Sequence, residues 1–333
     1  MKRPLPATWL VGRAVRLRPF EAEDAPLLRR FGEPVGRRGT VLIVQTHAGR
    51  DVGLVGFEAS GALASIGARF SERRSWTNGY AADALRLLRA GLFRTMPLVR
   101  VEALASADEE SLLRAYRAAG FTREGTMRRA LAGRDAFIFS SVRGESRKSL
   151  NTTRTMERST FTVDRHPRSI MVRLVRVTRR HLAAIREGIN SGSAASTTRW
   201  QMPRSLATIA AGSPRLLRRY AIETPAGVVG IAGLWSARFA GVELTIAIFK
   251  PSDRGRGIGS SAMNALCSIA FGELAARRIE LGVYPDNVRA LRTYLRCGFR
   301  REARLRSYIY HDGAWRDIAW MSMLRGERPT KGK

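Results

Sequence analysis

The stretch from residue 242 to residue 299 constrains the fold more than any other part of the chain. An apolar run at 242–249 leads into a glycine-rich turn at 254–260, and a second apolar run follows at 278–284. Between them, apolar residues recur at spacings of three and four: Met263, Leu266, Ala270 and Leu274. This spacing predicts a helix. The order strand, turn, helix, strand and further helix therefore predicts a mixed α/β structure.

The turn Arg254-Gly255-Arg256-Gly257-Ile258-Gly259-Ser260 is a candidate site for a pyrophosphate. A glycine-rich loop that enters a helix presents free backbone N–H groups at the positive end of the helix dipole. Glycines let a phosphate oxygen approach the backbone, and the two arginines add positive charge. The alternative is a plain basic loop. The turn has neither the P-loop pattern nor the spacing of a dinucleotide-binding motif.

Two motifs together resemble a known family. Arg254-x-x-Gly257-x-Gly259 after an apolar strand resembles the acetyl-CoA signature of the GNAT N-acetyltransferase superfamily. Downstream, Asn287-x-x-Ala290-x-x-x-Tyr294-x-x-x-Gly298-Phe299 resembles the second signature of that superfamily. The tail at 302–323, with its His311-Asp312-Gly313 turn, is similar to the branch that acetylates ribosomal-protein N-termini and polyamines.

The resemblance implies a fold and a binding site. Each domain would hold a mixed, mostly antiparallel sheet with flanking helices and a V-shaped splay between two central strands. Acetyl-CoA, or another acyl-CoA, would lie in this splay as co-substrate, and no metal is implied. The residues expected to bind it are Ala247, Ile248, Phe249, Arg254, Gly255, Arg256, Gly257, Ile258, Gly259, Ser260 and Asn287.

The resemblance also implies catalytic roles. Glu243 matches a general base, with a pKa raised by desolvation in an apolar strand; the alternative is an ion pair with an arginine at the sheet end. Tyr294 matches the acid that protonates the leaving thiolate, and its alternative is a packed core tyrosine. The backbone N–H groups of Ala247 and Phe249 would contact the thioester carbonyl and pantetheine. Asn287 either steadies the pantetheine or caps a helix.

The acceptor groove is the least defined part of the prediction. Its candidate residues are Trp200, Trp235, Tyr308, Tyr310 and Asp317, the last with a salt bridge as the favoured alternative.

Residues 1–143 resemble a degenerate copy of the second half. Tyr116-x-x-x-Gly120-Phe121 precedes Tyr294-x-x-x-Gly298-Phe299 by 178 residues, and at the same offset Trp76 stands for Arg254. We therefore expect two tandem GNAT-like domains: a degenerate one at 1–143 that binds acetyl-CoA weakly or not at all, a linker at 144–169, and a catalytic one at 170–328. An insert in the second copy would lie around 188–211.

The charge of the chain favours anionic partners. Lys and Arg number 58 against 28 acids, a net charge of +30. Such a field attracts CoA phosphates, nucleic acid or an acidic peptide. No apolar run is long enough to span a bilayer, and Cys267 and Cys297 fall in predicted helices. We expect a cytoplasmic protein with buried thiols.

The leading functional hypothesis is an N-acyltransferase that moves an acyl group from acyl-CoA to a primary amine by direct attack in a ternary complex. The amine would belong to a peptide, a protein N-terminus such as that of a ribosomal protein, or a small molecule, and RNA would contact the basic surface. Two alternatives are a non-catalytic RNA- or peptide-binding protein on a transferase fold, and an aminoacyl-tRNA-dependent transferase. The sequence leaves open the acceptor, the acyl length and the oligomeric state.

Overall fold

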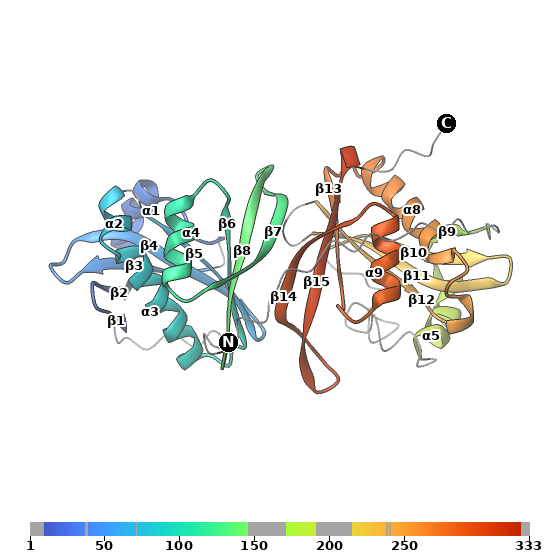
Figure 1. Ribbon diagram of the computed structural model, residues 1–333, viewed down its shortest axis with the longest axis horizontal. Coiled ribbons are helices and arrows are strands. Elements are labelled where there is room, and N and C mark those ends of the chain that lie inside the picture. Colours follow the sequence, from blue (N-terminus) through green and yellow to red (C-terminus); the bar gives the residue numbers. More distant parts are fainter. Residues whose placement is uncertain are drawn as a thin grey trace. The chain divides into compact units, whose positions relative to one another are not determined.

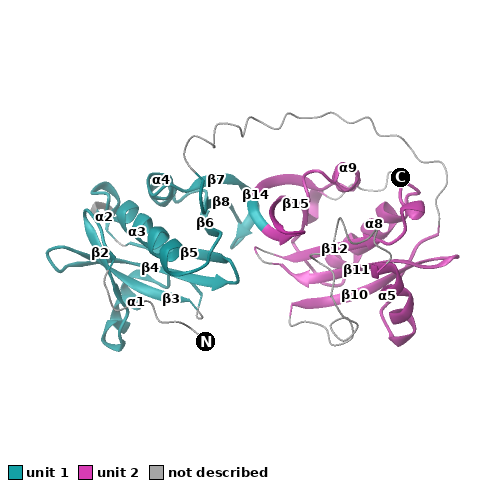
Figure 2. Ribbon diagram, turned by 90° about the horizontal axis from the view of Figure 1, so that it is seen from below, with its two compact units in different colours: residues 1–156, 306–308 teal, residues 157–305, 309–333 magenta. Residues whose placement is uncertain are grey.

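The computed structural model describes residues 10–36, 39–70, 72–145, 171–190, 215–237, 239 and 241–327. The chain divides into two compact units (Figure 2). Unit 1 comprises Met1–Met156 with Arg306–Tyr308, and unit 2 comprises Glu157–Leu305 with Ile309–Lys333. Almost all of the predicted linker and of the predicted insert lies outside the described residues.

Unit 1 is built from strands with helices inserted between groups of them along the chain (Figure 1). Its elements are β1 (Leu10–Val11), β2 (Val15–Pro19), η1 (Ala22–Asp24), α1 (Ala25–Phe31), β3 (Thr40–Thr46), β4 (Asp51–Ser60), β5 (Leu63–Arg69), α2 (Arg73–Thr77), α3 (Tyr80–Thr95), β6 (Arg100–Ser106), α4 (Glu110–Ala118), β7 (Thr122–Leu131) and β8 (Arg134–Val142).

The strands of unit 1 follow the order β1-β2-β3-β4-β5-β6-β8-β7. Neighbours are antiparallel except β5 and β6, which are parallel. Alternate side chains of one strand serve opposite faces of the sheet. Val44 packs in the main core with Leu85 of α3, whereas the adjacent Ile43 packs with Phe31 of α1. Both faces of this sheet are therefore covered by helices.

Unit 2 contains a similar series of elements. They are β9 (Arg173–Arg176), η3 (Arg179–His181), α5 (Leu182–Asn190), β10 (Leu216–Thr224), β11 (Gly227–Ser236), β12 (Val242–Ile248), η5 (Pro251–Asp253), α8 (Ile258–Phe271), β13 (Arg278–Val283), α9 (Val288–Arg296), β14 (Arg300–His311), β15 (Ala314–Leu324) and η6 (Arg325–Glu327).

The strand order of unit 2 is β9-β10-β11-β12-β13-β15-β14, which repeats the order from β2 to β7 in unit 1. Among the described strands of unit 2, only β12 and β13 pair in parallel. The apolar face of α8 packs with β12 and β13 in the main core, and α5 covers the other face through Ile185 and Phe249. The predicted mixed, mostly antiparallel α/β fold is confirmed.

The parallel ladder between β12 and β13 is short. It joins Val242 to Ile279 and Glu243 to Glu280, although β12 continues to Ile248. Beyond Glu243 the backbone of β12 has no ladder partner on the β13 side among the described residues. The two strands therefore leave an opening toward their C-terminal ends.

Each unit buries a matching cluster of one arginine and two glutamates. The arginine lies between a carboxylate from its own strand and one from the strand two places along the sheet, at distances of 2.5 to 2.9 Å. The members are Arg100, Glu102 and Glu124 in unit 1, and Arg278, Glu280 and Glu302 in unit 2. Corresponding members differ by 178 in number, the offset that also relates the sequence motifs.

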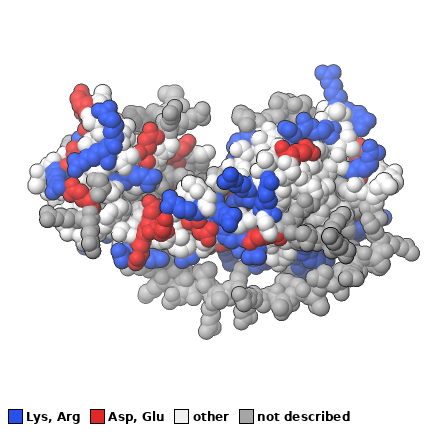
Figure 3. All heavy atoms as spheres, turned by 90° about the horizontal axis from the view of Figure 1, so that it is seen from above, with Lys and Arg blue, Asp and Glu red and all other residues white. Residues whose placement is uncertain are grey.

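The charged side chains are distributed widely. On the face in Figure 3, basic residues occur over both units and acidic residues lie among them. The described helices include none with the length and apolar character needed to cross a bilayer.

Candidate active site

The glycine-rich turn leads directly into helix α8. Gly255 and Gly257 have φ angles of +79° and +82°, in the left-handed region that side chains disfavour. Gly257 caps α8 without any side-chain hydrogen bond, and a Cβ at either glycine would meet no atom within 4 Å. The space beside these two glycines, next to the start of α8, is therefore open, and the cap residue offers no side chain to the first N–H groups. This geometry fits the predicted anion site.

The arginines around this turn behave differently from one another. The Arg254 guanidinium donates to the carbonyl oxygens of Ile248, at 3.1 Å, and Phe249, at 3.3 Å. Burial lowers the pKa of Arg254, and the positive charge of Arg289 lowers it further. Arg254 and Arg289 are thus close enough for their positive charges to repel each other, and a bound anion would relieve this repulsion. Arg256 is largely exposed and pairs with Asp253 at 3.5 Å.

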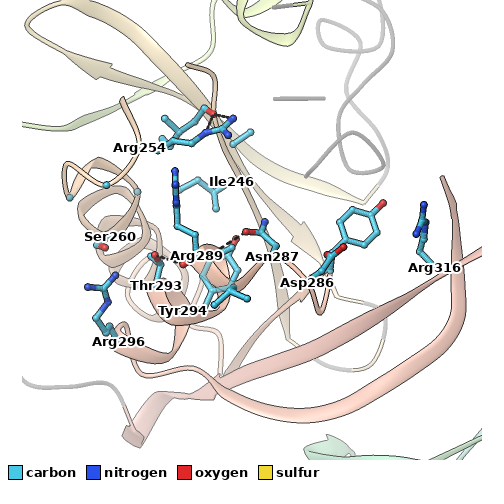
Figure 4. A pocket seen from close by; sticks show the side chains of 18 of the residues that line it. Ile246, Arg254, Ser260, Asp286, Asn287, Arg289, Thr293, Tyr294, Arg296 and Arg316 are labelled. Carbon is cyan, nitrogen blue, oxygen red and sulfur yellow. Dashed lines mark hydrogen bonds between the residues drawn. The ribbon is translucent and has the colours of Figure 1, made fainter. Parts of the chain in front are cut away.

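A cavity of about 760 Å³ begins at this turn. In Figure 4, Arg254, Ser260 and Arg296 lie at one end and Arg316 at the other. The residues that line the cavity are Ile246, Ala247, Ile248, Arg254, Gly255, Gly257, Gly259, Ser260, Tyr284, Asp286, Asn287, Val288, Arg289, Ala290, Thr293, Tyr294, Arg296, His311, Asp312 and Arg316.

Most of the residues predicted to bind acetyl-CoA line this cavity, and three do not. Phe249 and Ile258 are buried, and Arg256 points to solvent. Eight of them line the space: Ala247, Ile248, Arg254, Gly255, Gly257, Gly259, Ser260 and Asn287. Tyr294, predicted as the catalytic acid, lines it as well.

The predicted role of the Phe249 amide is wrong. This N–H donates to the carbonyl oxygen of Val229 at 2.9 Å, and the ring packs under α5. Hydrogen-bonded and non-hydrogen-bonded pairs alternate along an antiparallel ladder. Ala247 therefore also directs its N–H toward β11, while Ile246 and Ile248 direct theirs to the open side. The carbonyl of Ile248 confirms this direction, because it accepts from Arg254.

Glu243 lies where β12 and β13 still pair, and it is not among the residues that line the cavity. Its Oε2 atom is 3.2 Å from Nη2 of Arg215. Glu243 therefore forms an ion pair with an arginine, as its alternative interpretation states. A proton-accepting role for Glu243 has no support from its position.

Tyr294 and Asn287 both line the cavity from α9. Tyr294 is mostly buried, and burial raises the pKa of its hydroxyl, with a smaller contribution from Cys297. Its proton is therefore retained at neutral pH. The Oδ1 atom of Asn287 accepts a hydrogen bond from the N–H of Ala290 at 3.2 Å. Asn287 is thus a helix cap, as its alternative interpretation states, and it also faces the cavity.

The predicted acceptor groove is not where the cavity lies. Asp317 forms an ion pair with Arg304 at 2.7 Å, and Trp235 donates to Thr245 at 3.0 Å. Trp200 lies outside the described residues. The far end of the cavity is instead formed by residues that the sequence did not single out as a site: Tyr284, Asp286, His311, Asp312 and Arg316.

The corresponding region of unit 1 carries packed aromatic side chains. Gly79 caps α3 with a φ angle of +76°, as Gly257 caps α8. Trp76, at the position of Arg254, packs edge-on against Phe70 with ring centroids 5.0 Å apart. Tyr116, which corresponds to Tyr294, is only 1% exposed. Unit 1 keeps the helix start but has an indole in place of the guanidinium.

Comparison with known proteins establishes the family. Residues 29–122 and 172–300, more than half of the chain, match the sequence model of the acetyltransferase (GNAT) domain. The chain belongs to the GNAT acetyltransferase family. The predicted family membership is confirmed.

Relatives match over parts of their length. A probable N-acetyltransferase, YjcK of Bacillus subtilis, is 34% identical over 70 residues, which are 21% of this chain and 39% of that protein. A prophage-derived uncharacterized N-acetyltransferase, YokL of the same organism, is 32% identical over 82 residues, 25% of this chain and 46% of that protein. The chain thus spans less than half the length of these relatives.

Solved structures are also similar. A spermidine N-acetyltransferase from Vibrio cholerae in complex with CoA and spermine is 22% identical, with a TM-score of 0.41, over 47% of this chain and 96% of that one. A putative acetyltransferase from Sphaerobacter thermophilus is 22% identical, with a TM-score of 0.35, over 41% of this chain and 96% of that one.

Proposed function

We propose that this GNAT protein is an N-acyltransferase that moves an acetyl group, or another acyl group, from acyl-CoA to a primary amine by direct attack in a ternary complex. The amine belongs to a peptide, a protein N-terminus or a small molecule. The observation that carries the proposal is one cavity that joins the uncapped start of α8 to the Tyr294 side chain.

The residues at the start of α8 suit the diphosphate of CoA. The first N–H groups of the helix have no side-chain cap, and the glycines leave space beside them. Arg289 and Arg296 add positive charge to the same cavity. The open-side N–H groups of Ile246 and Ile248 are the proposed partners of the pantetheine and the thioester carbonyl. Acyl-CoA, when bound, supplies an electrophilic thioester carbonyl.

Tyr294 is the proposed proton donor to the leaving sulfur. Its raised pKa keeps the hydroxyl protonated, and the side chain lines the cavity. A proton delivered to the thiolate prevents the reverse attack on the new amide.

We also propose that the chain holds two tandem GNAT-like domains, 1–143 and 170–328, of which the second is catalytic. The repeated strand order and the matching Arg–Glu clusters support the duplication. Trp76 in place of Arg254 supports loss of CoA binding in the first domain. The net charge of +30 supports an acceptor that is presented on an acidic peptide or an RNA-associated protein.

The test is incubation of the whole chain with acetyl-CoA and a panel of primary amines, followed by measurement of free CoA thiol. A parallel melting experiment measures CoA binding, because ligand at 100 times its Kd stabilises by about 2.7 kcal/mol. The proposal expects a melting shift with CoA and thiol release with at least one amine. Absence of both effects would overturn it.

A further inference from the structure

Two buried polar atoms in the wall of the cavity have no hydrogen-bond partner among the described residues. They are the hydroxyl oxygen of Tyr284 and the Nε2 atom of His311, and both side chains line the cavity. The two rings are neighbours, with centroids 5.7 Å apart and planes inclined by 41°. Buried polar groups in folded proteins are nearly always paired, so two orphans side by side in one cavity point to a ligand.

The surroundings of His311 favour one tautomer. Its Nδ1 atom lies 3.2 Å from Oδ2 of Asp312, in the turn between β14 and β15. A carboxylate at this distance favours the proton on Nδ1, which leaves a lone pair on Nε2. Asp312 and Gly313 have φ angles of +49° and +75°, so the turn itself sets the position of the carboxylate. The orphaned Nε2 atom is therefore a hydrogen-bond acceptor that is shielded from bulk water.

The charges at this end of the cavity favour a cation. Asp286 follows β13, and Asp312 lies in the opposite turn; Arg316 is the basic side chain here (Figure 4). Burial raises the pKa of Tyr284 to about 12, and Asp312 adds to this effect. The hydroxyl is therefore neutral at physiological pH. A primary ammonium group carries three donors, which matches two carboxylates, a hydroxyl oxygen and an imidazole lone pair.

We propose that this end of the cavity binds the primary ammonium group of the acceptor, and that His311, oriented by Asp312, is the general base that removes its proton. The Tyr284 hydroxyl oxygen accepts a second hydrogen bond from the same nitrogen and holds its direction. This assignment rests on the proposed acyltransferase function, and it names the base and the class of acceptor for that reaction.

The proton balance of the step is simple. His311 takes one proton from the ammonium, and the neutral amine then forms a C–N bond to the carbonyl carbon of the acyl thioester. The C–S bond breaks, Tyr294 protonates the departing sulfur, and the amide nitrogen returns a proton to the tyrosine. The imidazolium of His311 releases its proton to solvent. The net products are one amide, one thiol and one proton.

Glu243 is the competing base. It is paired with Arg215 at the closed end of the strand opening and does not line the cavity. His311 has an unpaired acceptor atom, an orienting carboxylate and a place in the cavity wall. Geometry comes before pKa in the choice of a general base, and it favours the histidine.

The decisive experiment compares His311→Gln with the whole wild-type chain. General-base catalysis contributes roughly 10²- to 10⁴-fold, so we expect a fall of that size in kcat/KM, with the Kd for CoA unchanged. A general base must be unprotonated to act, so the wild-type kcat/KM falls at low pH, and the variant loses this limb of the profile. The variant leaves unchanged Tyr284 and Asp312, which lie beside the imidazole, and Asp286 and Arg316, which line the same cavity. A weakly basic amine, already neutral at pH 7, reduces the deficit of the variant.

Two further variants keep the test decisive. Asp312→Asn changes a mostly exposed residue and moves the low-pH limb, even if His311→Gln fails to fold. Asp317→Asn removes a carboxylate of the same hairpin that pairs with Arg304 outside the cavity, and it leaves the profile unchanged. Wild-type-like rates and pH profiles in both His311→Gln and Asp312→Asn would overturn this inference but not the proposed function. A wild-type chain that binds no CoA and acetylates no amine would overturn the proposed function.

Discussion

Replacement of Gly257 by alanine tests the anion site with a built-in control. Its φ of +82° and ψ of −10° lie in the left-handed region, which costs a side chain about 1–2 kcal/mol. The new Cβ meets no atom within 4 Å, so the cost is conformational and not steric. A loss of about 1 kcal/mol lowers Tm by about 2–4 °C in a unit of this size.

The effect on CoA binding is expected to be larger than the effect on stability. Relaxation of φ at residue 257 turns the first N–H groups of α8 away from the bound phosphate. The loss of one hydrogen bond to a charged group is about 1.5–3 kcal/mol, or roughly 10- to 100-fold in Kd. Isothermal titration with CoA measures this change directly.

Gly79→Ala is the matched control. Gly79 caps α3 with a φ of +76° and a ψ of 5°, and a Cβ there also meets nothing within 4 Å. We expect the same loss of stability and no change in CoA affinity, because Trp76 replaces the arginine in that unit. Wild-type CoA affinity in Gly257→Ala, or equal losses of affinity in both variants, would refute the reasoning.

Three further predictions follow from the burial and pairing of single side chains. Tyr294→Phe should lower kcat by roughly 100-fold, with CoA affinity retained. Because burial raises the pKa of Tyr294, the wild-type rate should show no alkaline limb from this tyrosine below pH 10. Rapid-quench and steady-state assays check both expectations. Burial raises the pKa of Glu280, beside Arg278, to about 7, so the folded protein binds this proton more tightly than the unfolded chain does. The free energy of unfolding therefore falls as pH rises from about 4.5 to 7. Melting curves should show a weaker pH dependence in Glu280→Gln. Glu243→Gln should change kcat by less than about threefold and the free energy of unfolding by about 1 kcal/mol or less, since it breaks one partly exposed ion pair with Arg215. A fall in kcat of roughly 100-fold with retained CoA binding would restore Glu243 as the base.

Local patterns were sufficient for the elements that position the site. The apolar run at 242–249 is β12, which ends at Ile248. The helix predicted after the glycine turn is α8, and the run at 278–284 is β13. Each of these features depends on residues close in sequence, whose spacing and backbone preferences act locally. The cap at Asn287 is also local, and it was foreseen as an alternative.

The details of the site depend on longer-range pairing. The side to which the Phe249 N–H points is set by the register with Val229, and a shift of one residue would reverse it. Glu243 meets Arg215 through a contact between segments that are 28 residues apart. Neither relation is visible in the spacing of motifs.

The sequence by itself determined the family, the mixed α/β class and the glycine turn that begins α8, because these follow from the order and spacing of residue types. Only the tertiary structure placed Tyr284 at the end of one strand beside His311 at the end of another. Strand pairing brings together side chains that lie far apart in the chain, and burial then deprives them of water. That combination produces the two unpaired atoms in the cavity wall.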